Sequence, residues 1–158
     1  MNDVLLLERW DTLRDILLPF LVRCGAAGVC GALIGIEREL KGKPAGFRTN
    51  ILICLGSAMY MTVGILLVNE GGQASDPARI AAQVVTGIGF LGAGCIIQDR
   101  GRISGLTTAA TIWVVAGIGI VSGAGFPILA FISTLLVLLT LVVLGAVEKR
   151  FLDPERSE

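Results

Sequence analysis

Hydrophobic residues occur in five long runs along the chain, and short polar stretches with glycine, proline or charged residues separate them. Each run is close to the roughly 20 mostly apolar residues that a helix needs to cross about 30 Å of hydrocarbon. The pattern therefore predicts an all-α integral membrane protein with about five membrane-spanning helices. Their expected bounds are residues 16–36, 50–69, 79–98, 105–123 and 126–147.

The two ends of the chain are more polar than the five runs. Residues 1–15 mix leucines and Trp10 with charges, which is typical of a short amphipathic helix at a membrane surface. Asp3 and Glu8 precede any basic cluster, and the apolar run that follows is long enough for a full span, so we expect no cleavable signal peptide. The predicted organisation is an interfacial segment at 1–15, a membrane domain at 16–147 and a polar tail at 148–158.

Composition agrees with this pattern. Of the 158 residues, 54% are hydrophobic and 16% are charged, whereas a soluble domain averages about 45–50% apolar and about 25% charged residues. Basic residues gather in the loops after the first and third spans and in the tail, which together hold nine lysines and arginines against three on the other side. This asymmetry predicts a multi-pass protein with its N-terminus outside and its C-terminus in the cytoplasm.

The stretch GIGFLG at residues 87–92 has the glycine spacing of a dinucleotide-binding loop. That fold needs a strand before the motif and an acidic residue about 20 positions after it, and this sequence offers neither. Small residues also let helix backbones approach closely in lipid, and this role is favoured here. The predicted helix-packing residues, through which we also expect a homo-oligomer, are Ala27, Gly31, Gly35, Gly89 and Gly92.

Polar residues gather at the expected cytoplasmic ends of the spans. The candidates are Glu37, Arg38, Glu39, Arg48, Asn50, Asp99, Thr107 and Thr108. One interpretation is a solvated rim of charges that fixes the topology and pairs locally. The other is a site for a partner protein or an ion.

Arg23 is the one charge that lies well inside a predicted span. Such a charge is costly and by default marks a functional site. Its side chain can snorkel toward the outer surface, because helix side chains lean toward the N-terminus. Alternatively it belongs to a polar layer that receives an anion or a partner's carboxylate. Residues at a matching depth on other spans are Gln83, Thr86, Thr62, Ser133 and Thr134.

Several kinds of chemistry are disfavoured. The chain has no histidine, no phosphate-binding loop of the G-x-x-x-x-G-K-[ST] type and no cysteine spacing typical of a metal site. Every aspartate and glutamate lies outside the spans or at their ends, so a magnesium pore within one chain is not expected. We expect no catalytic residue, no cofactor, no bound metal and no nucleic-acid partner; the expected partners are membrane lipid and other proteins.

Three stretches carry a family resemblance. GALIGIERELKGKPAGFRTNILICLGSA, RIAAQVVTGIGFLGAGCII and GLTTAATIWVVAGIG resemble the membrane domain of the MgtC/SapB family. The resemblance implies about five spans in a bacterial inner membrane, and an association with growth at low magnesium and with survival inside host cells. Many members also carry a cytoplasmic C-terminal domain, which we expect this chain to lack.

The resemblance also implies regulation of membrane energetics, including inhibition of F-type ATP synthase in some members. The leading hypothesis is therefore a non-catalytic inner-membrane modulator of membrane energetics or magnesium homeostasis. It would act by helix-mediated contact with a membrane transport or ATP synthase complex. The alternative hypothesis is a small ion (Mg²⁺ or other cation) or solute transporter or channel.

Overall fold

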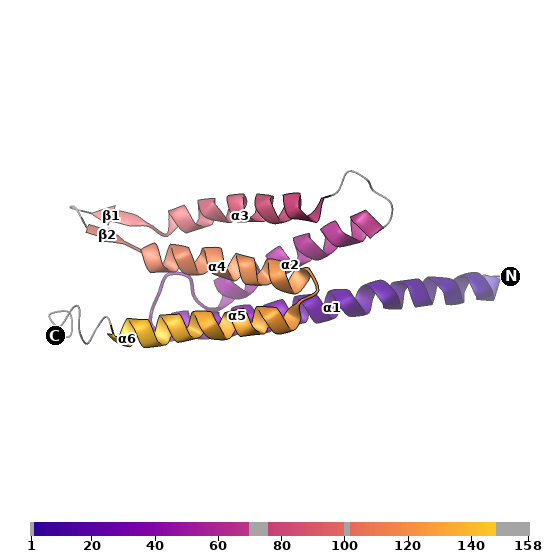
Figure 1. Cartoon of the computed structure of the whole chain (residues 1–158), viewed down its shortest axis with the longest axis horizontal. Helices are drawn as coiled ribbons and strands as arrows, with labels where there is room; N and C mark the ends of the chain where they lie inside the picture. The colour runs from indigo at the N-terminus through magenta and orange to yellow at the C-terminus, as the bar shows by residue number, and fades with distance from the viewer. Residues whose placement is uncertain (1, 70–75, 100–101, 148–158) are drawn as a thin grey trace.

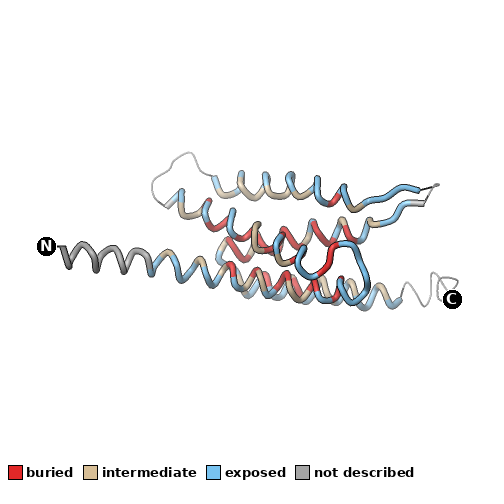
Figure 2. The backbone as a smooth tube through the Cα atoms, turned by 180° about the vertical axis from the view of Figure 1, so that it is seen from behind, coloured by how far each residue is buried: buried red, intermediate tan, exposed pale blue. Residues whose placement is uncertain are grey.

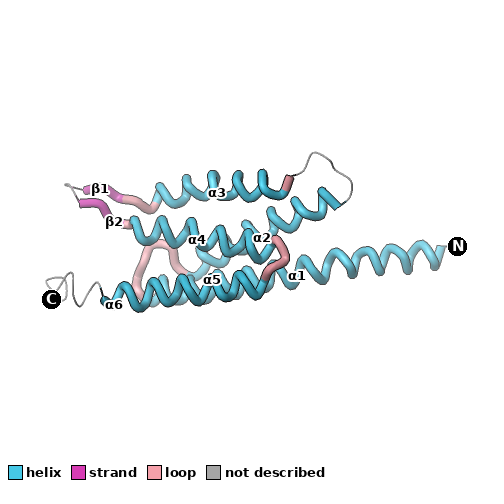
Figure 3. The backbone as a smooth tube through the Cα atoms, in the orientation of Figure 1, coloured by secondary structure: helices cyan, strands magenta, loops and turns pink. Residues whose placement is uncertain are grey.

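The computed structural model describes residues 2–69, 76–99 and 102–147, which form a bundle of five long helices with one small hairpin (Figures 1 and 3). Successive helices run in opposite directions along the long axis of the bundle (Figure 1). The prediction of an all-α bundle is confirmed, with five long helices in the described residues, and four of the five predicted spans are long and apolar enough to cross a membrane. The predicted tail at 148–158 lies outside the described residues.

Helix α1 (Asn2–Leu40) joins the predicted interfacial segment to the first predicted span without a break. Neither glycine nor proline occurs between Asn2 and Pro19, so nothing in this stretch favours a turn. The N-terminal part of α1 projects beyond the other helices (Figure 1). Whether residues 1–15 lie on a membrane surface stays a prediction.

Helices α2 (Phe47–Asn69) and α4 (Leu106–Gly123) agree with the predicted second and fourth spans to within three residues. Four segments of the described residues are long and apolar enough to cross a membrane: Arg14–Leu40, Phe47–Val68, Leu106–Gly123 and Pro127–Val147. Helix α3 (Pro77–Gly94) has 18 residues, or about 27 Å at 1.5 Å per residue. It contains Arg79 and Gln83, which lower its hydropathy.

The predicted third span, 79–98, is wrong at its second end. Helix α3 ends at Gly94, and the chain then forms an antiparallel hairpin of β1 (Ile97–Asp99) and β2 (Arg102–Ser104), in which Asp99 pairs with Arg102. Gly105 follows the hairpin with a φ of 88°, and a Cβ atom there would collide with the carbonyl oxygen of Cys95. A residue without a side chain is therefore required where the hairpin meets α4.

The predicted fifth span, 126–147, consists of three consecutive helical elements. Helix α5 (Pro127–Leu139) continues into a π-helical turn, η1 (Thr140–Leu144), and then into a short helix, α6 (Gly145–Val147). Single π-helical turns inside α-helices are rare and occur frequently at functional sites. Hydrophobic periodicity alone does not reveal such a turn.

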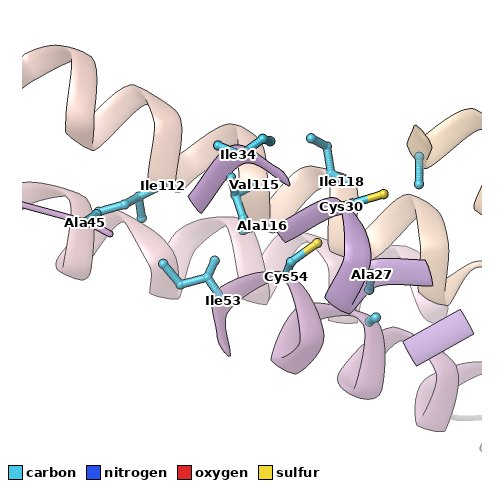
Figure 4. Close-up of a cluster of buried hydrophobic side chains, with 12 residues drawn as sticks. Ala27, Cys30, Ile34, Ala45, Ile53, Cys54, Ile112, Val115, Ala116 and Ile118 are labelled. Atoms are coloured by element: carbon cyan, nitrogen blue, oxygen red, sulfur yellow. The ribbon is translucent and has the colours of Figure 1, made fainter. Parts of the chain in front are cut away.

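The core lies where α1, α2 and α4 meet (Figures 2 and 4). It consists mostly of small and β-branched side chains from these three helices, and Figure 4 shows Ile34, Ile112 and Val115 among them. The loop between α1 and α2 adds Ala45, whose side chain lies beside Ile112 (Figure 4). Small side chains allow the helix axes to approach closely.

Glycines form the contact between α1 and α2. A Cβ atom added to Gly31 would lie 2.7 Å from the carbonyl oxygen of Asn50, and one added to Gly35 would lie 2.8 Å from the Cα atom of Phe47. On α4, Gly119 and Gly123 lie equally close to the backbone of α2. The repeat of small residues every four positions thus holds three helices together.

Candidate functional site

The last turn of α1 carries a buried ion pair. Glu37 and Arg38 are 9% and 2% exposed, and the Nε atom of Arg38 lies 2.7 Å from Oε2 of Glu37. A second donor, Nη2 of Arg38, lies 3.2 Å from Oε1 of the same carboxylate. The pair is therefore bidentate, the geometry in which arginine holds a carboxylate most specifically.

Lys41 is a second cation bound to the carboxylate of Glu37, and it also contacts a helix near the C-terminal end of the described chain. Its Nζ atom lies 2.7 Å from Oε1 of Glu37, four residues earlier on the helix. The same atom donates a hydrogen bond of 3.1 Å to the carbonyl oxygen of Leu141, which belongs to the π-helical turn η1. Lys41 thus links the end of α1 to η1.

Asn50 lies fully buried in the first turns of α2 and holds the loop between α1 and α2. Its Nδ2 atom donates to the carbonyl oxygens of Ala45 and Gly46, at 2.7 Å and 2.8 Å. Glu39 is exposed, and its Oε2 atom accepts a hydrogen bond from the backbone N–H of Phe47, which begins α2. Glu39 therefore satisfies a free N–H at the start of that helix.

The buried polar residues at this end of the bundle lie one helical turn beyond the apolar core. Arg38 lies one helical turn beyond Ile34 on the same face of α1, and Thr108, 3% exposed, lies one turn before Ile112 on α4. Asn50 occupies the equivalent position one turn before Cys54 on α2. We call Glu37, Arg38, Asn50, Thr108 and the adjoining Lys41 the Glu37 layer.

Two buried atoms of the Glu37 layer have no hydrogen-bond partner among the described residues. They are Nη1 of Arg38, which is a donor, and Oδ1 of Asn50, which is an acceptor. Buried polar atoms are normally paired, and one water molecule or small polar ligand can satisfy a donor and an acceptor together. Two cations and one carboxylate make the layer unsuited to Mg²⁺, which prefers oxygen ligands with negative charge. Within the described ranges no three His, Cys, Asp or Glu residues lie close enough to hold a metal ion.

The remaining polar candidates of this end do not join the layer. Arg48 and Thr107 are exposed at the starts of α2 and α4, and Asp99 is exposed in β1. The carbonyl oxygen of Thr107 accepts a hydrogen bond of 2.7 Å from the hydroxyl of Thr111. The structure thus separates the predicted rim into a buried layer and an exposed border.

Arg23 lies at the opposite end of the bundle and has a partner within the chain. Its Nη1 atom donates a hydrogen bond of 3.1 Å to the carbonyl oxygen of Gly123, the last residue of α4. The hydroxyl of Thr62, which donates to Ala58 of its own helix at 2.8 Å, also lies 3.1 Å from this oxygen, and the hydroxyl of Ser122 donates to the carbonyl oxygen of Arg23 at 2.7 Å. Arg23 therefore caps the C-terminus of α4, where a cation is favoured by the helix dipole.

The turn after α4 makes room for this guanidinium. Gly125 has a φ of 97°, and a Cβ atom there would lie 3.3 Å from Nη2 of Arg23. We call Arg23, Thr62, Ser122 and Gly123 the Arg23 layer. It is about 21 Å from the Glu37 layer, because 14 residues of α1 separate Arg23 from Glu37.

The other residues predicted at the depth of Arg23 make no described hydrogen bond with Arg23 or Gly123. Gln83 and Thr86 are exposed on α3, which packs against α2 and α4, and the Thr86 hydroxyl donates to the carbonyl oxygen of Ala82. Ser133 and Thr134 donate to carbonyl oxygens of their own helix. Of the residues predicted at this depth, only Thr62 approaches the oxygen that Arg23 binds. Ser122 and Gly123, which also contact Arg23, were not predicted.

The two predicted packing glycines of α3 differ in their surroundings. A Cβ atom on Gly92 would be in ordinary contact with Ala109 of α4, at 3.6 to 3.9 Å. Gly89 has no atom within 4 Å of such a position and is exposed. If Gly89 packs against a helix, that helix belongs to another molecule.

Replacing Arg23 tests its capping role. Arg23→Leu should lower the free energy of unfolding by about 1 kcal/mol, because Gly123 loses a charged donor. Arg23→Lys should lose less, since an ammonium group can also donate to a carbonyl oxygen. Melting temperatures in detergent measure both, with Arg14→Leu, an exposed position on the same helix, as the control. An unchanged melting temperature for Arg23→Leu would favour a snorkelling side chain instead.

Two features of these layers were missed from the sequence. The spacing of Glu37 and Lys41 by four residues is a recognisable helical ion-pair signal, but the local pairing predicted for the charged rim did not name this pair. The contacts of Arg23 with α4 and of Lys41 with η1 join residues 99 and 100 positions apart in the sequence. No local pattern indicates those pairings.

Comparisons with known proteins identify several relatives of this chain by sequence. A model described as the MgtC family matches residues 25–150. The YhiD protein of Escherichia coli K12, whose name proposes a magnesium transporter, is 44% identical over 85% of this chain and 64% of its own length. Protein MgtC of Salmonella typhimurium LT2 is 39% identical over 87% of this chain and 57% of its own length.

An uncharacterised protein of Haemophilus influenzae is 48% identical over 73% of this chain and 51% of its own length. This chain thus spans between about half and two thirds of the length of these relatives. No solved structure matches the chain.

Proposed function

This chain belongs to the MgtC family, and from that premise we propose that it modulates membrane energetics or magnesium homeostasis without catalysing a reaction. It is a multi-pass membrane protein, and we place it in the bacterial inner membrane. Its proposed action is helix-mediated contact with a membrane transport complex or an ATP synthase. The name of the YhiD relative, which proposes a magnesium transporter, supports the link to magnesium, and the relative named MgtC supports the family. Neither name distinguishes modulation from transport.

The apolar core between the two polar layers is the observation that favours modulation. Over the roughly 21 Å that separate the layers, the buried core consists mainly of alanine, cysteine, isoleucine and valine. The buried polar side chains between the layers are Ser57, Thr111 and Thr134, and the hydroxyls of Thr111 and Thr134 donate to carbonyl oxygens of their own helices. A transport path for a hydrated cation needs polar groups that replace its water. The described core of a single copy supplies no such line of groups.

The proposed orientation rests on the basic residues. The end of the bundle with the Glu37 layer holds five of the nine described lysines and arginines, namely Arg38, Lys41, Lys43, Arg48 and Arg102. Basic loops remain in the cytoplasm. An impermeant thiol reagent applied to intact cells should label a cysteine at Asp76 and spare one at Lys43, and the reverse pattern would invert the topology.

The proposed contacts with other chains involve exposed helix surfaces. Gly89 is exposed and free of neighbours, so it remains a candidate for packing within a homo-oligomer or against a partner helix. The partner itself is proposed by class only, as an ATP synthase or another transport complex.

Co-purification from native membranes tests the proposal. Under mild detergent, a modulator should bring down subunits of one energy-coupling or transport complex in constant ratio. The control variant is Gly25→Leu, an exposed α1 position with no neighbour within 4 Å, which should bring down the same subunits as the wild type. Isolation of the protein without any such complex, at low magnesium and at high magnesium, would count against modulation by contact.

A further inference from the structure

A groove of about 720 Å³ runs between α2 and α3. The two helices touch near the Arg23 layer, where Gly64 contacts the side chain of Ile80. Farther along, α3 packs on α4 instead, through Gly92 and Ala109. Gly56 and Gly87 line the groove from its two walls, and neither has an atom within 4 Å of a Cβ position. The groove is therefore open because glycines replace side chains on both walls.

The lining changes from polar to apolar along the groove. Near the end with the Arg23 layer it includes Asp76, Arg79 and Gln83, and toward the other end it includes Ile88 and Leu91. From Arg79 to Leu91 the helix rises about 18 Å, slightly more than half of a hydrocarbon core of about 30 Å. A groove of this length, charged at one end and apolar at the other, matches one leaflet of a bilayer.

The two charges at the polar end are not paired with each other. The ion pairs of the described residues all involve Glu37. Asp76 uses its Oδ1 atom to accept from the backbone N–H of Ala78, which caps α3 and leaves the second carboxylate oxygen available. Arg79 is exposed. One anion and one cation that are three residues apart in the lining of one groove are complementary to a ligand that also carries both charges.

We propose that the groove between α2 and α3 binds one phospholipid with a phosphate and an amine in its headgroup. The guanidinium of Arg79 holds the phosphate, since its planar donors fit phosphate oxygens. The free oxygen of Asp76 accepts from the ammonium group, and an acyl chain lies along Ile88 and Leu91 between Gly56 and Gly87. A protein helix fits less well, because its apolar surface would bury both charges without partners. The site is independent of the proposed modulator function.

Native mass spectrometry with added phosphatidylethanolamine tests the site. We expect one lipid to bind tightly to the wild-type protein, and Gly87→Leu or Gly56→Leu to remove this binding by filling the groove. Arg79→Gln should weaken the binding about tenfold, as expected for the loss of one charge-assisted hydrogen bond. The matched control is Gly94→Leu, which adds the same side chain at an exposed position of the same helix outside the groove lining and should bind as the wild type does.

Folding and oligomer size are measured on the same samples. Both glycine variants should keep the wild-type melting temperature, because no atom lies near the added Cβ. Equal lipid binding by Gly87→Leu, Gly56→Leu and wild type would overturn the proposal. So would a change of oligomer size in the groove variants with lipid binding intact, since the occupant would then be a helix of a second copy.

Discussion

Replacing Gly31 by leucine is expected to lower the free energy of unfolding by about 3 kcal/mol, the upper end of the usual cost of overpacking. A Cβ atom at this position would lie 2.7 Å from the carbonyl oxygen of Asn50 and 2.9 Å from the Cα atom of Ile51. Both are backbone atoms, so no side-chain rotation can relieve the contact. Helices α1 and α2 must separate, and the separation also disturbs Asn50, which holds the loop between them.

The matched control for Gly31 lies three residues earlier on the same helix. Gly28 has no atom within 4 Å of a Cβ position, so Gly28→Leu should leave the melting temperature in detergent nearly unchanged. Equal melting temperatures for the two variants would show that α1 and α2 do not pack through Gly31.

Replacing Glu37 by glutamine is the second change with a large expected effect. It leaves Arg38, which is 2% exposed, without a counter-charge in the bundle. Removing one partner of a buried ion pair typically costs about 3 kcal/mol or more. The variant should also loosen Lys41 from its place between α1 and η1, because the same carboxylate holds both cations. Unfolding in detergent measures the loss.

Two further variants separate the charge from the shape of Glu37. Glu39→Gln changes an exposed neighbour whose replacement can still accept from Phe47, so its cost should stay below about 1 kcal/mol. Glu37→Gln combined with Arg38→Met removes both buried charges and should recover most of the stability lost in the single variant. If the double variant is no more stable than Glu37→Gln alone, the cost does not come from an unpaired Arg38.

The helices and their closest contact were predictable because both depend on local sequence. Long apolar runs define membrane helices, and the repeat of Ala27, Gly31 and Gly35 marks a close-packing face whatever its partner is. The same repeat occurs at Gly119 and Gly123, and it could have been used to predict the packing of α4 on α2. The hairpin after α3 was missed because strands of three residues are too short to show alternation.

The candidate site was predictable only in part. The polar candidates differ in burial: Arg38 and Asn50 are buried, whereas Arg48 and Asp99 are exposed. No sequence pattern predicts which polar residues at a helix end are buried. For Arg23, its depth within the predicted span suggested either a side chain that snorkels to the outer surface or a site for an anion or a partner's carboxylate. Its actual partner, the carbonyl oxygen of Gly123, depends on how the end of α4 meets α1.

Magnesium flux into liposomes that contain this protein alone tests the proposed function most directly. Because the core between the Arg23 layer and the Glu37 layer is mainly apolar and contains no buried charge, we predict that the flux measured with an enclosed magnesium indicator equals that of protein-free liposomes. The protein must be shown to be folded and inserted, which a wild-type melting temperature after extraction establishes. Magnesium entry that rises in proportion to the amount of inserted protein, and that Gly31→Leu abolishes, would contradict modulation by contact and identify a transporter.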